Sequence, residues 1–398
     1  MKVLILHNDF RVYWKGRLTY LKKFLNSNNI EFYAIELFGK GSPYIFDRYD
    51  NVEKWWSCLF PEQSFNELSV KKLKSALFAK LDEIDPDVVI TGSIVFFSGA
   101  LGIRWAKNHR KKFIMFDDAK PSQVKRNLLV QSIKDLITRQ IDGMWLPTKD
   151  YDAEYAGLDR NNVVFFHGYN CINNELFKFN TSREIVGKVI VCVARLVPIK
   201  NLDNLLRTWK LIEAKNPEYK LVIIGDGPEF EHLNHLKTNL KLERVVFLGA
   251  VNNTDIPTYF YNASAFILPS LSESWGLVVN EALAAGLPVL LSNKINARNS
   301  LLKEGVNGFG FNPLSVSEMT DKINKYISLD LDTKMVMSKK SLEMIDEMSY
   351  QNMGRELVTA LDKIVHKKHK KLSFFAWLAI NFWHGKYNTS GWDKLDKL

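Results

Sequence analysis

Residues 266–289 read FILPSLSESWGLVVNEALAAGLPV, and this stretch contains the pattern that decides the fold. An apolar run is followed by a polar loop, an apolar helical segment, a glycine and a proline, and a second apolar run begins at Val289. This order predicts a buried strand, a helix that stops at Gly286, and a second buried strand. Near-continuous apolar strands that alternate with helices favour a parallel sheet covered on both faces.

The same alternation extends through both halves of the chain, with helical periodicity at Gly16–Leu25 and Val70–Ile84. The expected strands are Val3–Leu6, Ile30–Leu37, Val88–Thr91, Phe113–Phe116, Gly143–Leu146 and Val163–Phe166, then Lys188–Ala194, Lys220–Ile224, Val245–Leu248, Ala265–Leu268 and Val289–Leu291. Two such series in 398 residues predict an α/β protein with two Rossmann-like, doubly wound domains facing each other across a cleft.

The domain boundaries are predicted from composition. We expect an N-terminal domain over residues 1–183, a C-terminal domain over residues 184–362 and a tail over residues 363–398. The join is placed in the polar stretch Lys178–Gly187, and the C-terminal helix is expected to cross back to the first domain.

Bulk composition is that of a soluble globular protein, with 46% hydrophobic and 25% charged residues. Three widely spaced cysteines argue against a disulfide framework and for a reducing compartment. The apolar run at the amino end is too short for a signal peptide, and no apolar stretch reaches the length of a membrane span. These features predict a cytoplasmic protein.

The formal charge of +10 is concentrated in two places. Between Leu101 and Gln140 there are ten Lys or Arg and three acids, and between Lys363 and Trp392 there are six Lys and no acid. A localised basic surface favours a polyanion or an anionic membrane as partner. The alternative, a solvated charged face, stays open.

The basic cluster Lys367–Lys371 directly precedes an aromatic-rich apolar segment, Leu372–Trp383, that is too short to cross a bilayer. Two interpretations remain for it. The segment lies in a membrane interface, on the inner face of the cell membrane, or it is a last helix that packs on the first domain.

Two glutamates define the candidate ligand site. Glu273 falls in the loop after the first strand of the opening stretch, and Glu281 falls inside the helix that starts near Trp275-Gly276. The first amides of that helix are a natural phosphate site. Carboxylates beside a phosphate site suit hydroxyl groups, so the pattern predicts a nucleotide-sugar. The ordinary alternative is a capping glutamate and an exposed helical one.

Neighbouring loops strengthen this interpretation. Arg195 and Lys200 follow another strand and can converge on a diphosphate, which needs charge compensation without a metal. Gly225-Asp226-Gly227-Pro228 is a tight turn after the next strand, and Gly249-Ala250-Val251 is placed to receive the base. No convincing metal-ligand cluster occurs, so we expect neither a metal nor a cofactor.

Together these motifs resemble the retaining glycosyltransferases of family GT4 (group 1), which have the GT-B fold. The resemblance covers about residues 188–315 and includes Phe247-Leu248-Gly249 and Gly305-Val306-Asn307-Gly308-Phe309. It implies that Glu273 contacts the donor sugar, Glu281 the ribose, and Arg195 and Lys200 the diphosphate. It also implies a metal-independent reaction with a UDP- or GDP-sugar.

The first half departs from the family. Only Gly16 remains of the usual glycine-rich loop, and Asp117-Asp118 stands where many members have a histidine. Asp118 is our catalytic hypothesis there, and a cap on the following helix is the alternative. We interpret His7 and His167 as structural.

The expected site residues fall into two groups. The catalytic group is Glu273, Asp118, Arg195 and Lys200. The donor-binding group is Gly16, Arg195, Lys200, Gly225, Gly249, Val251, Glu273, Ser274, Trp275, Gly276, Leu277 and Glu281.

The expected acceptor is a glycan or lipid-linked glycan of surface polysaccharide, lipopolysaccharide or glycolipid synthesis. A sugar-nucleotide epimerase of the same fold is the main alternative. A nucleic-acid-binding protein is disfavoured because no base-reading module occurs. An inactive scaffold is disfavoured because every donor-site motif is present.

Overall fold

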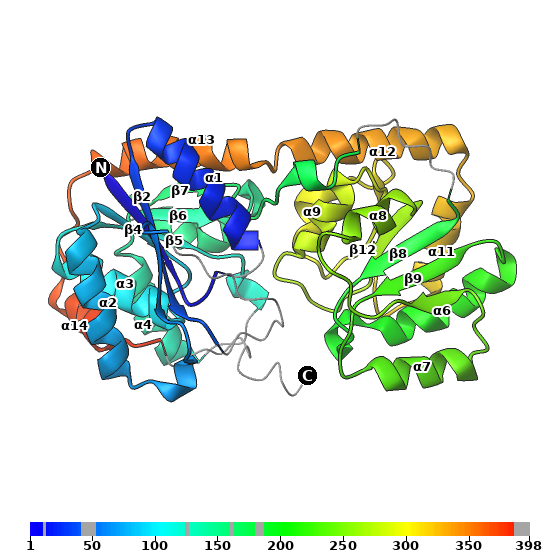
Figure 1. The fold of residues 1–398 in the computed structure, drawn as a ribbon, viewed down its shortest axis with the longest axis horizontal. Coiled ribbons are helices and arrows are strands. Elements are labelled where there is room, and N and C mark those ends of the chain that lie inside the picture. The colour runs from blue at the N-terminus through cyan, green and yellow to red at the C-terminus, as the bar shows by residue number, and fades with distance from the viewer. Residues whose placement is uncertain (11–12, 41–52, 124–126, 160–161, 180–186, 386–398) are drawn as a thin grey trace. The chain divides into compact units, whose positions relative to one another are not determined.

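The computed structural model describes residues 1–10, 13–40, 53–123, 127–159, 162–179 and 187–385. The chain forms two compact units (Figure 1). The first contains Met1–Asn170 together with the described residues from Tyr350 onward, and the second contains Cys171–Ser349. The expected pair of Rossmann-like domains is confirmed, because each unit is built on a parallel sheet with helices in the crossovers.

The first unit has a seven-stranded parallel sheet in the order β3-β2-β1-β4-β5-β6-β7. Its strands are β1 (Lys2–His7), β2 (Glu31–Phe38), β3 (Trp56–Phe60), β4 (Val88–Thr91), β5 (Lys112–Phe116), β6 (Gly143–Leu146) and β7 (Val164–His167). Its helices are α1 (Tyr13–Ser27), α2 (Val70–Ile84), α3 (Phe97–Asn108), α4 (Leu128–Thr138), α5 (Ala156–Asp159), α13 (Tyr350–Val365) and α14 (Phe374–Phe382).

The second unit has a six-stranded parallel sheet in the order β10-β9-β8-β11-β12-β13. Its strands are β8 (Val189–Val193), β9 (Lys220–Ile224), β10 (Val245–Phe247), β11 (Ala265–Leu268), β12 (Val289–Ser292) and β13 (Gly308–Phe311). Its helices are α6 (Leu202–Lys215), α7 (Phe230–Asn239), α8 (Ile256–Tyr261), α9 (Leu277–Ala284), α10 (Arg298–Leu301), α11 (Val316–Ile327) and α12 (Leu331–Asp346).

Two strands were missing from the sequence prediction, β3 and β13. The sequence of β13 is GFGF, and glycine in a strand normally counts against that assignment. Here the glycine is required by close approach, because a Cβ on Gly308 would lie 1.8 Å from the carbonyl oxygen of Val289 on β12. Contact with the neighbouring strand β12 therefore requires glycine at position 308.

The two compact units divide at 170/171 and 349/350, whereas composition predicted boundaries at 183/184 and 362/363. The short segment after Asn170 belongs to the second unit, because Asn174 Nδ2 donates to the carbonyl oxygen of Ile345 at 3.1 Å and the Phe177 ring packs beside Phe260. Part of the expected join, residues 180–186, lies outside the described residues.

The chain returns to the first unit at α13, as expected for the crossing helix. Two glycines allow close packing there. A Cβ on Gly354 would lie 2.7 Å from the Phe24 ring of α1, and a Cβ on Gly143 of β6 would lie 2.6 Å from Ile364. The tail then places α14 against α3 and α4. Across the described ranges, no helix combines the length and the apolarity that a membrane crossing requires.

Candidate functional site

The candidate site of the second unit lies at the carboxyl edge of its sheet. β8 and β11 are adjacent, but the chain leaves them toward opposite halves of the sheet, so their loops diverge at the topological switch point. Ligands of doubly wound sheets bind at this position. The loop after β8 contains Arg195 and Lys200, and the loop after β11 contains Glu273.

Lys200 and Glu273 form an ion pair across these two loops. The side chains are 19% and 15% exposed, so the charges compensate each other in a largely buried position. Ser270 Oγ also donates to Glu273 Oε1, at 2.8 Å. The sequence placed Lys200 and Glu273 in one site, and the structure brings them into direct contact.

Asn201 organises these loops, and the sequence interpretation had overlooked it. Its backbone is left-handed, with φ of 56°, and its side-chain amide donates to the carbonyl oxygens of Pro269 and Pro313 at 3.1 and 2.8 Å. It therefore ties together the loops after β8, β11 and β13. A signal was available, because asparagine is enriched among the non-glycine residues that adopt a left-handed backbone.

The turn after β9 packs directly on the loop after β8. A Cβ on Gly225 would lie 1.9 Å from the carbonyl oxygen of Ala194, and one on Gly227 would lie 2.5 Å from that of Leu196. The Gly225 amide donates to the Gly249 carbonyl oxygen at 2.8 Å, which attaches the loop after β10. Close packing against the loop after β8 thus explains why both positions of the turn are glycine. No ligand contact tests the donor role predicted for Gly225, Gly249 and Val251.

Helix α9 begins at Leu277, after Gly276 at φ of 97°. Trp275 is buried, and its indole donates to Asn280 Oδ1 at 2.9 Å, which fixes the segment before the helix. Glu281 lies one turn into α9 and is 7% exposed. The ordinary alternative of an exposed helical glutamate is therefore wrong. Ser274 is exposed in the loop before the helix.

A buried thiol also lies near the Lys200–Glu273 pair. Burial raises the pKa of Cys192 to about 12, while the positive charge of Lys200 opposes that rise. Cys192 is a protonated core thiol at neutral pH, so it offers no nucleophile to the site.

The first unit has its own polar cluster at the carboxyl edge, centred on Asp118 after β5. Burial, reinforced by the neighbouring charge of Asp117, raises the pKa of Asp118 to about 6. Asn170 Nδ2 donates to Asp118 Oδ2 at 3.4 Å. Asp117 Oδ1 accepts the Ala119 amide at 3.0 Å in a local turn, and α4, the next α-helix, is capped by Asn127 rather than by either aspartate.

Aromatic and basic groups surround Asp118. Burial lowers the pKa of His7, whose imidazole stacks on Phe116 with centroids 5.6 Å apart. Burial raises the pKa of Tyr169, and the charge of Asp118 adds to that rise. The Arg17 guanidinium lies 5.2 Å from the centroid of the Trp14 ring. A titratable carboxyl thus lies in an aromatic setting at the edge where ligands of such sheets bind.

Local contacts explain the residue type at two other positions singled out in the sequence, Gly16 and His167. Gly16 lies in α1, where a Cβ would be 2.2 Å from the Tyr350 hydroxyl, so it makes room for α13. His167 Nε2 lies 2.7 Å from Asp152 Oδ1, which fits the structural role expected of that histidine. No ligand contact tests the donor role predicted for Gly16.

Among the described residues, one group lies close enough to hold a metal ion: Asp203, Glu229 and His232. His232 Nε2 is 2.9 Å from Asp203 Oδ2, and both side chains are exposed. Asp203 raises the pKa of His232 through a hydrogen bond. Asp203 lies on α6, His232 lies on α7 and Glu229 directly precedes α7, whereas Lys200 and Glu273 lie in loops. We interpret Asp203 and His232 as a surface ion pair.

The two doubly wound units define the class of protein, and the comparison with solved structures confirms the GT-B fold. Anabaena HepE in complex with UDP matches with a TM-score of 0.70 at 17% identity, over 91% of this chain and 100% of that one. Sucrose-phosphate synthase from Thermosynechococcus elongatus matches with a TM-score of 0.69 at 15% identity, over 91% and 99%.

Residues 174–344 match the family model of glycosyl transferases group 1. This range lies within the second unit and makes up most of it, so the second unit is a glycosyl transferases group 1 domain.

Curated relatives agree with this assignment. An uncharacterized glycosyltransferase of Haemophilus influenzae is 31% identical over 46% of this chain and 51% of that protein. An Escherichia coli UDP-Gal:alpha-D-GlcNAc-diphosphoundecaprenol alpha-1,3-galactosyltransferase is 33% identical over 44% of each. The alignments thus span about half the length of these relatives or less.

Proposed function

We propose that this protein is a retaining, metal-independent glycosyltransferase. It transfers a sugar from a UDP- or GDP-sugar to a hydroxyl of a glycan or lipid-linked glycan in surface polysaccharide or glycolipid synthesis. The observation that carries the proposal is the Lys200–Glu273 pair at the switch point of a glycosyl transferases group 1 domain.

The arrangement around that pair supports donor binding. Beyond the pair lies the start of α9, whose first amides offer donors to a phosphate, and the almost buried Glu281 follows on the same helix. Lys200 and Arg195 supply positive charge for a diphosphate. Glu273 and Glu281 supply carboxylate oxygens for hydroxyls of the sugar and the ribose.

The reaction requires one bond exchange at the anomeric carbon. The bond to the diphosphate oxygen breaks, and the bond to the acceptor oxygen forms on the same face. The acceptor proton passes to the departing phosphate oxygen. Arg195, Lys200 and the start of α9 stabilise the negative charge that develops on the leaving group. Asp118 accepts a hydrogen bond from the acceptor hydroxyl in this proposal.

The relatives support a lipid-linked or glycan acceptor. The name of the Escherichia coli relative specifies a diphosphoundecaprenol-linked sugar as its substrate, and the HepE structure is a complex with UDP. The relatives reported above are named as transferases, so the epimerase alternative is not proposed.

A thermal-shift screen of the full chain with UDP-, GDP- and ADP-sugars tests the donor. A ligand at one hundred times its Kd stabilises a protein by about 2.7 kcal/mol, which is a readily measured shift. The Glu281→Gln variant should lose most of the shift, whereas Glu231→Gln on the exposed face of α7 should retain it.

Transfer itself is tested with the donor that the screen selects and a lipid extract as acceptor. The proposal expects a product whose anomeric configuration, read by NMR, equals that of the donor, and activity that survives chelation of metal ions. An inverted product or no nucleotide-sugar binding would overturn it. Free sugar formed equally well without an acceptor would point to a different reaction.

A further inference from the structure

Helix α14 is attached firmly to the first unit. Arg104 donates to the carbonyl oxygens of Ile380 and Trp383, and the Trp383 indole donates to that of Ile94 at 2.7 Å. Ser373 Oγ accepts the Ala376 amide at 3.2 Å and caps the helix. Because the helix is held in place, its outward face is a defined surface of the unit.

That outward face is apolar. At about 100° per residue, Phe374, Phe375, Trp377 and Phe382 fall within an arc of about 160°, and the buried Ala376 and Ile380 fall on the opposite side. The adjacent α4 adds further exposed apolar side chains. We call the following set the apolar face: Leu128, Leu129, Ile133, Phe374, Phe375, Trp377 and Phe382. Their exposed fractions lie between 43% and 84%.

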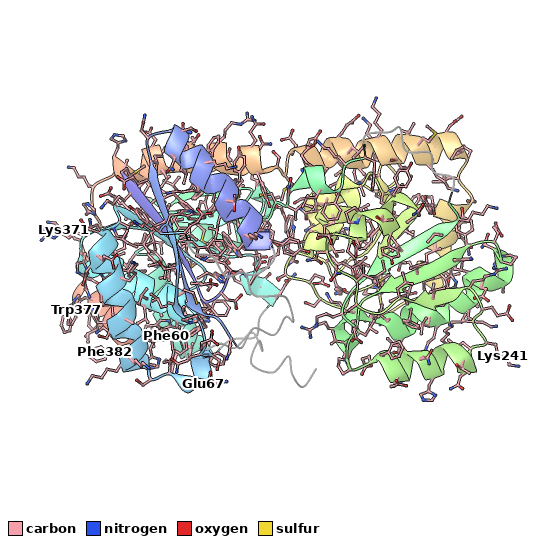
Figure 2. The ribbon with its side chains drawn as sticks, in the orientation of Figure 1. Phe60, Glu67, Lys241, Lys371, Trp377 and Phe382 are labelled. Atoms are coloured by element: carbon pink, nitrogen blue, oxygen red, sulfur yellow. The ribbon has the colours of Figure 1, made fainter. Side chains whose placement is uncertain are left out.

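Such a grouping needs an explanation. Single exposed apolar residues are ordinary, but a cluster of them on two neighbouring helices marks an interaction surface. Figure 2 places Lys371, Trp377 and Phe382 along one side of the first unit, so the apolar face continues into the basic segment that precedes α14.

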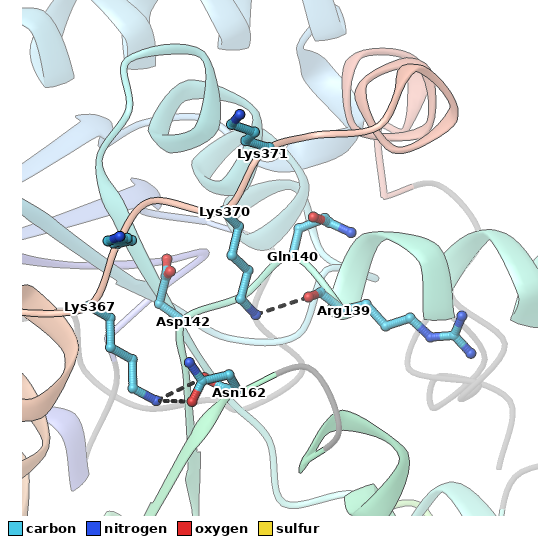
Figure 3. A pocket seen from close by; sticks show the side chains of 8 residues that line it. Arg139, Gln140, Asp142, Asn162, Lys367, Lys370 and Lys371 are labelled. Atoms are coloured by element: carbon cyan, nitrogen blue, oxygen red, sulfur yellow. Dashed lines mark hydrogen bonds between the residues drawn. The ribbon is translucent and has the colours of Figure 1, made fainter.

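The basic segment lines a cavity of about 390 Å³ (Figure 3). We call it the lysine cavity. Its lining residues are Arg139, Gln140, Asp142, Asn162, Lys367, Lys368, Lys370 and Lys371. Arg139, Asp142 and Asn162 precede β6 and β7, so the cavity lies at the amino ends of these strands. The Asp118 cluster lies at their carboxyl ends, so the cavity is a separate site.

Asp142, which lines the lysine cavity, does not balance the positive charge of the lysines there. Asp142 is paired with Lys107 at 2.6 Å and also accepts the Phe113 amide at 2.9 Å. Lys370 Nζ donates to the carbonyl oxygens of Arg139 and Ile141, and Lys367 Nζ donates to Asn162. Neutral oxygens satisfy these ammonium groups without cancelling their charge.

The pKa of Lys370 is lowered to about 8, mainly by burial, with the nearby Lys107, Lys367 and Lys112 contributing to the decrease and Asp142 opposing it. Burial likewise lowers the pKa of His369, with Lys112 contributing. Cations that depress one another in this way favour an anion as an additional partner.

We propose that the apolar face and the lysine cavity together form a docking surface for an anionic phospholipid membrane. The aromatic rings enter the interface between headgroups and acyl chains, and the lysines bind lipid phosphates. The combination selects this partner, because cations complement the charged headgroups while the adjacent rings need an apolar phase. The proposal rests on residues other than the donor site and stands independently of the proposed reaction.

Vesicle co-sedimentation of the full chain tests the proposal. We expect binding to vesicles of phosphatidylcholine with phosphatidylglycerol and much weaker binding to phosphatidylcholine alone, with sensitivity to salt. Phe375→Ala with Phe382→Ala should weaken partitioning by about tenfold, and Lys368→Gln with Lys371→Gln by a similar factor.

The control variant is Leu331→Ala with Val336→Ala, which removes exposed apolar side chains from α12 of the second unit. It should bind vesicles as the unmodified protein does. All variants should keep their melting temperature and their response to nucleotide-sugars, which separates membrane docking from the donor site.

Equal binding to both vesicle types would overturn the proposal, as would variants that bind like the unmodified protein. Sedimentation velocity without lipid supplies a further check. If the apolar-face variants convert a dimer to a monomer and leave vesicle binding unchanged, the face joins two copies of this chain and the proposal is wrong.

Discussion

The ammonium group of Lys200 contacts Glu273 Oε1, so a cation from the loop after β8 and a carboxylate from the loop after β11 compensate each other at the switch point. Both charges reach the site from separate strands. A donor diphosphate would compete with Glu273 for Lys200, and a sugar hydroxyl would compete with Lys200 for Glu273. The pair therefore gives specific predictions.

Lys200→Met should lower kcat/KM for transfer by about 100-fold or more, because it removes charge that stabilises the leaving diphosphate. Stability should fall by about 1–2 kcal/mol, because Glu273 stays largely buried without its cation. Lys188→Met is the matched control, since its ion pair with Glu218 is exposed and should contribute less than about 1 kcal/mol. Kinetics and thermal unfolding of both variants check this, and equal effects would contradict it.

Gly225→Ala should destabilise the protein by about 3 kcal/mol. The new Cβ would lie 1.9 Å from the Ala194 carbonyl oxygen, and φ of 139° is unfavourable for alanine. Gly157→Ala serves as the comparison, because a Cβ there meets no atom within 4 Å. Denaturant unfolding of both variants gives the difference. A Gly225→Ala protein as stable as the Gly157→Ala protein would show that the two loops are not packed as described.

Asn201→Ala should lower the stability by about 2 kcal/mol, because two hydrogen bonds to the carbonyl oxygens of Pro269 and Pro313 are lost, only the second of which keeps a donor in Asn204, and the left-handed backbone becomes unfavourable. Donor affinity should fall as the loops loosen. Asn201→Gly removes the same hydrogen bonds but tolerates the backbone, so it should recover part of the stability and none of the loop contacts. Calorimetry with donor titration separates the two effects.

Asp118→Asn should change how stability depends on pH. The folded-state pKa of about 6 lies above the ordinary value of 3.8, so the folded protein holds this proton more tightly than the unfolded chain. The resulting stabilisation is complete below about pH 4 and is lost as pH rises through about 6. As pH rises from about 4 through about 6, the free energy of unfolding of the variant should therefore increase relative to that of the unmodified protein, by up to about 3 kcal/mol.

Urea unfolding between pH 4 and pH 8 measures this difference, with the exposed Asp321→Asn as control. Transfer activity should also depend on the ionisation of Asp118, but it should increase with pH where stability decreases. If the Asp118 carboxylate receives the acceptor hydroxyl, activity of the unmodified protein rises through about pH 6, and Asp118→Asn removes that rise. A pH-independent stability difference would contradict the buried position of Asp118.

Many of the strands in both units were predicted from the sequence. Val88–Thr91 and Gly143–Leu146 in the first unit, and Lys220–Ile224 and Ala265–Leu268 in the second, were predicted to the residue, because a short apolar run bounded by turn residues suits a buried parallel strand. The strand β13 was missed because its glycines are favoured by tertiary contacts, Gly308 with Val289 of β12 and Gly310 with the Arg298 side chain, and local patterning does not contain these contacts.

The sequence by itself determined the alternation of strands and helices, and with it two doubly wound sheets and the position of Glu273 and Glu281 around the start of one helix. Only the tertiary structure decided that Lys200 contacts Glu273, that Asn201 connects three loops, and that burial raises the pKa of Asp118 to about 6. Strand periodicity is a local property of consecutive residues, whereas these contacts and the burial of Asp118 join segments far apart in the chain.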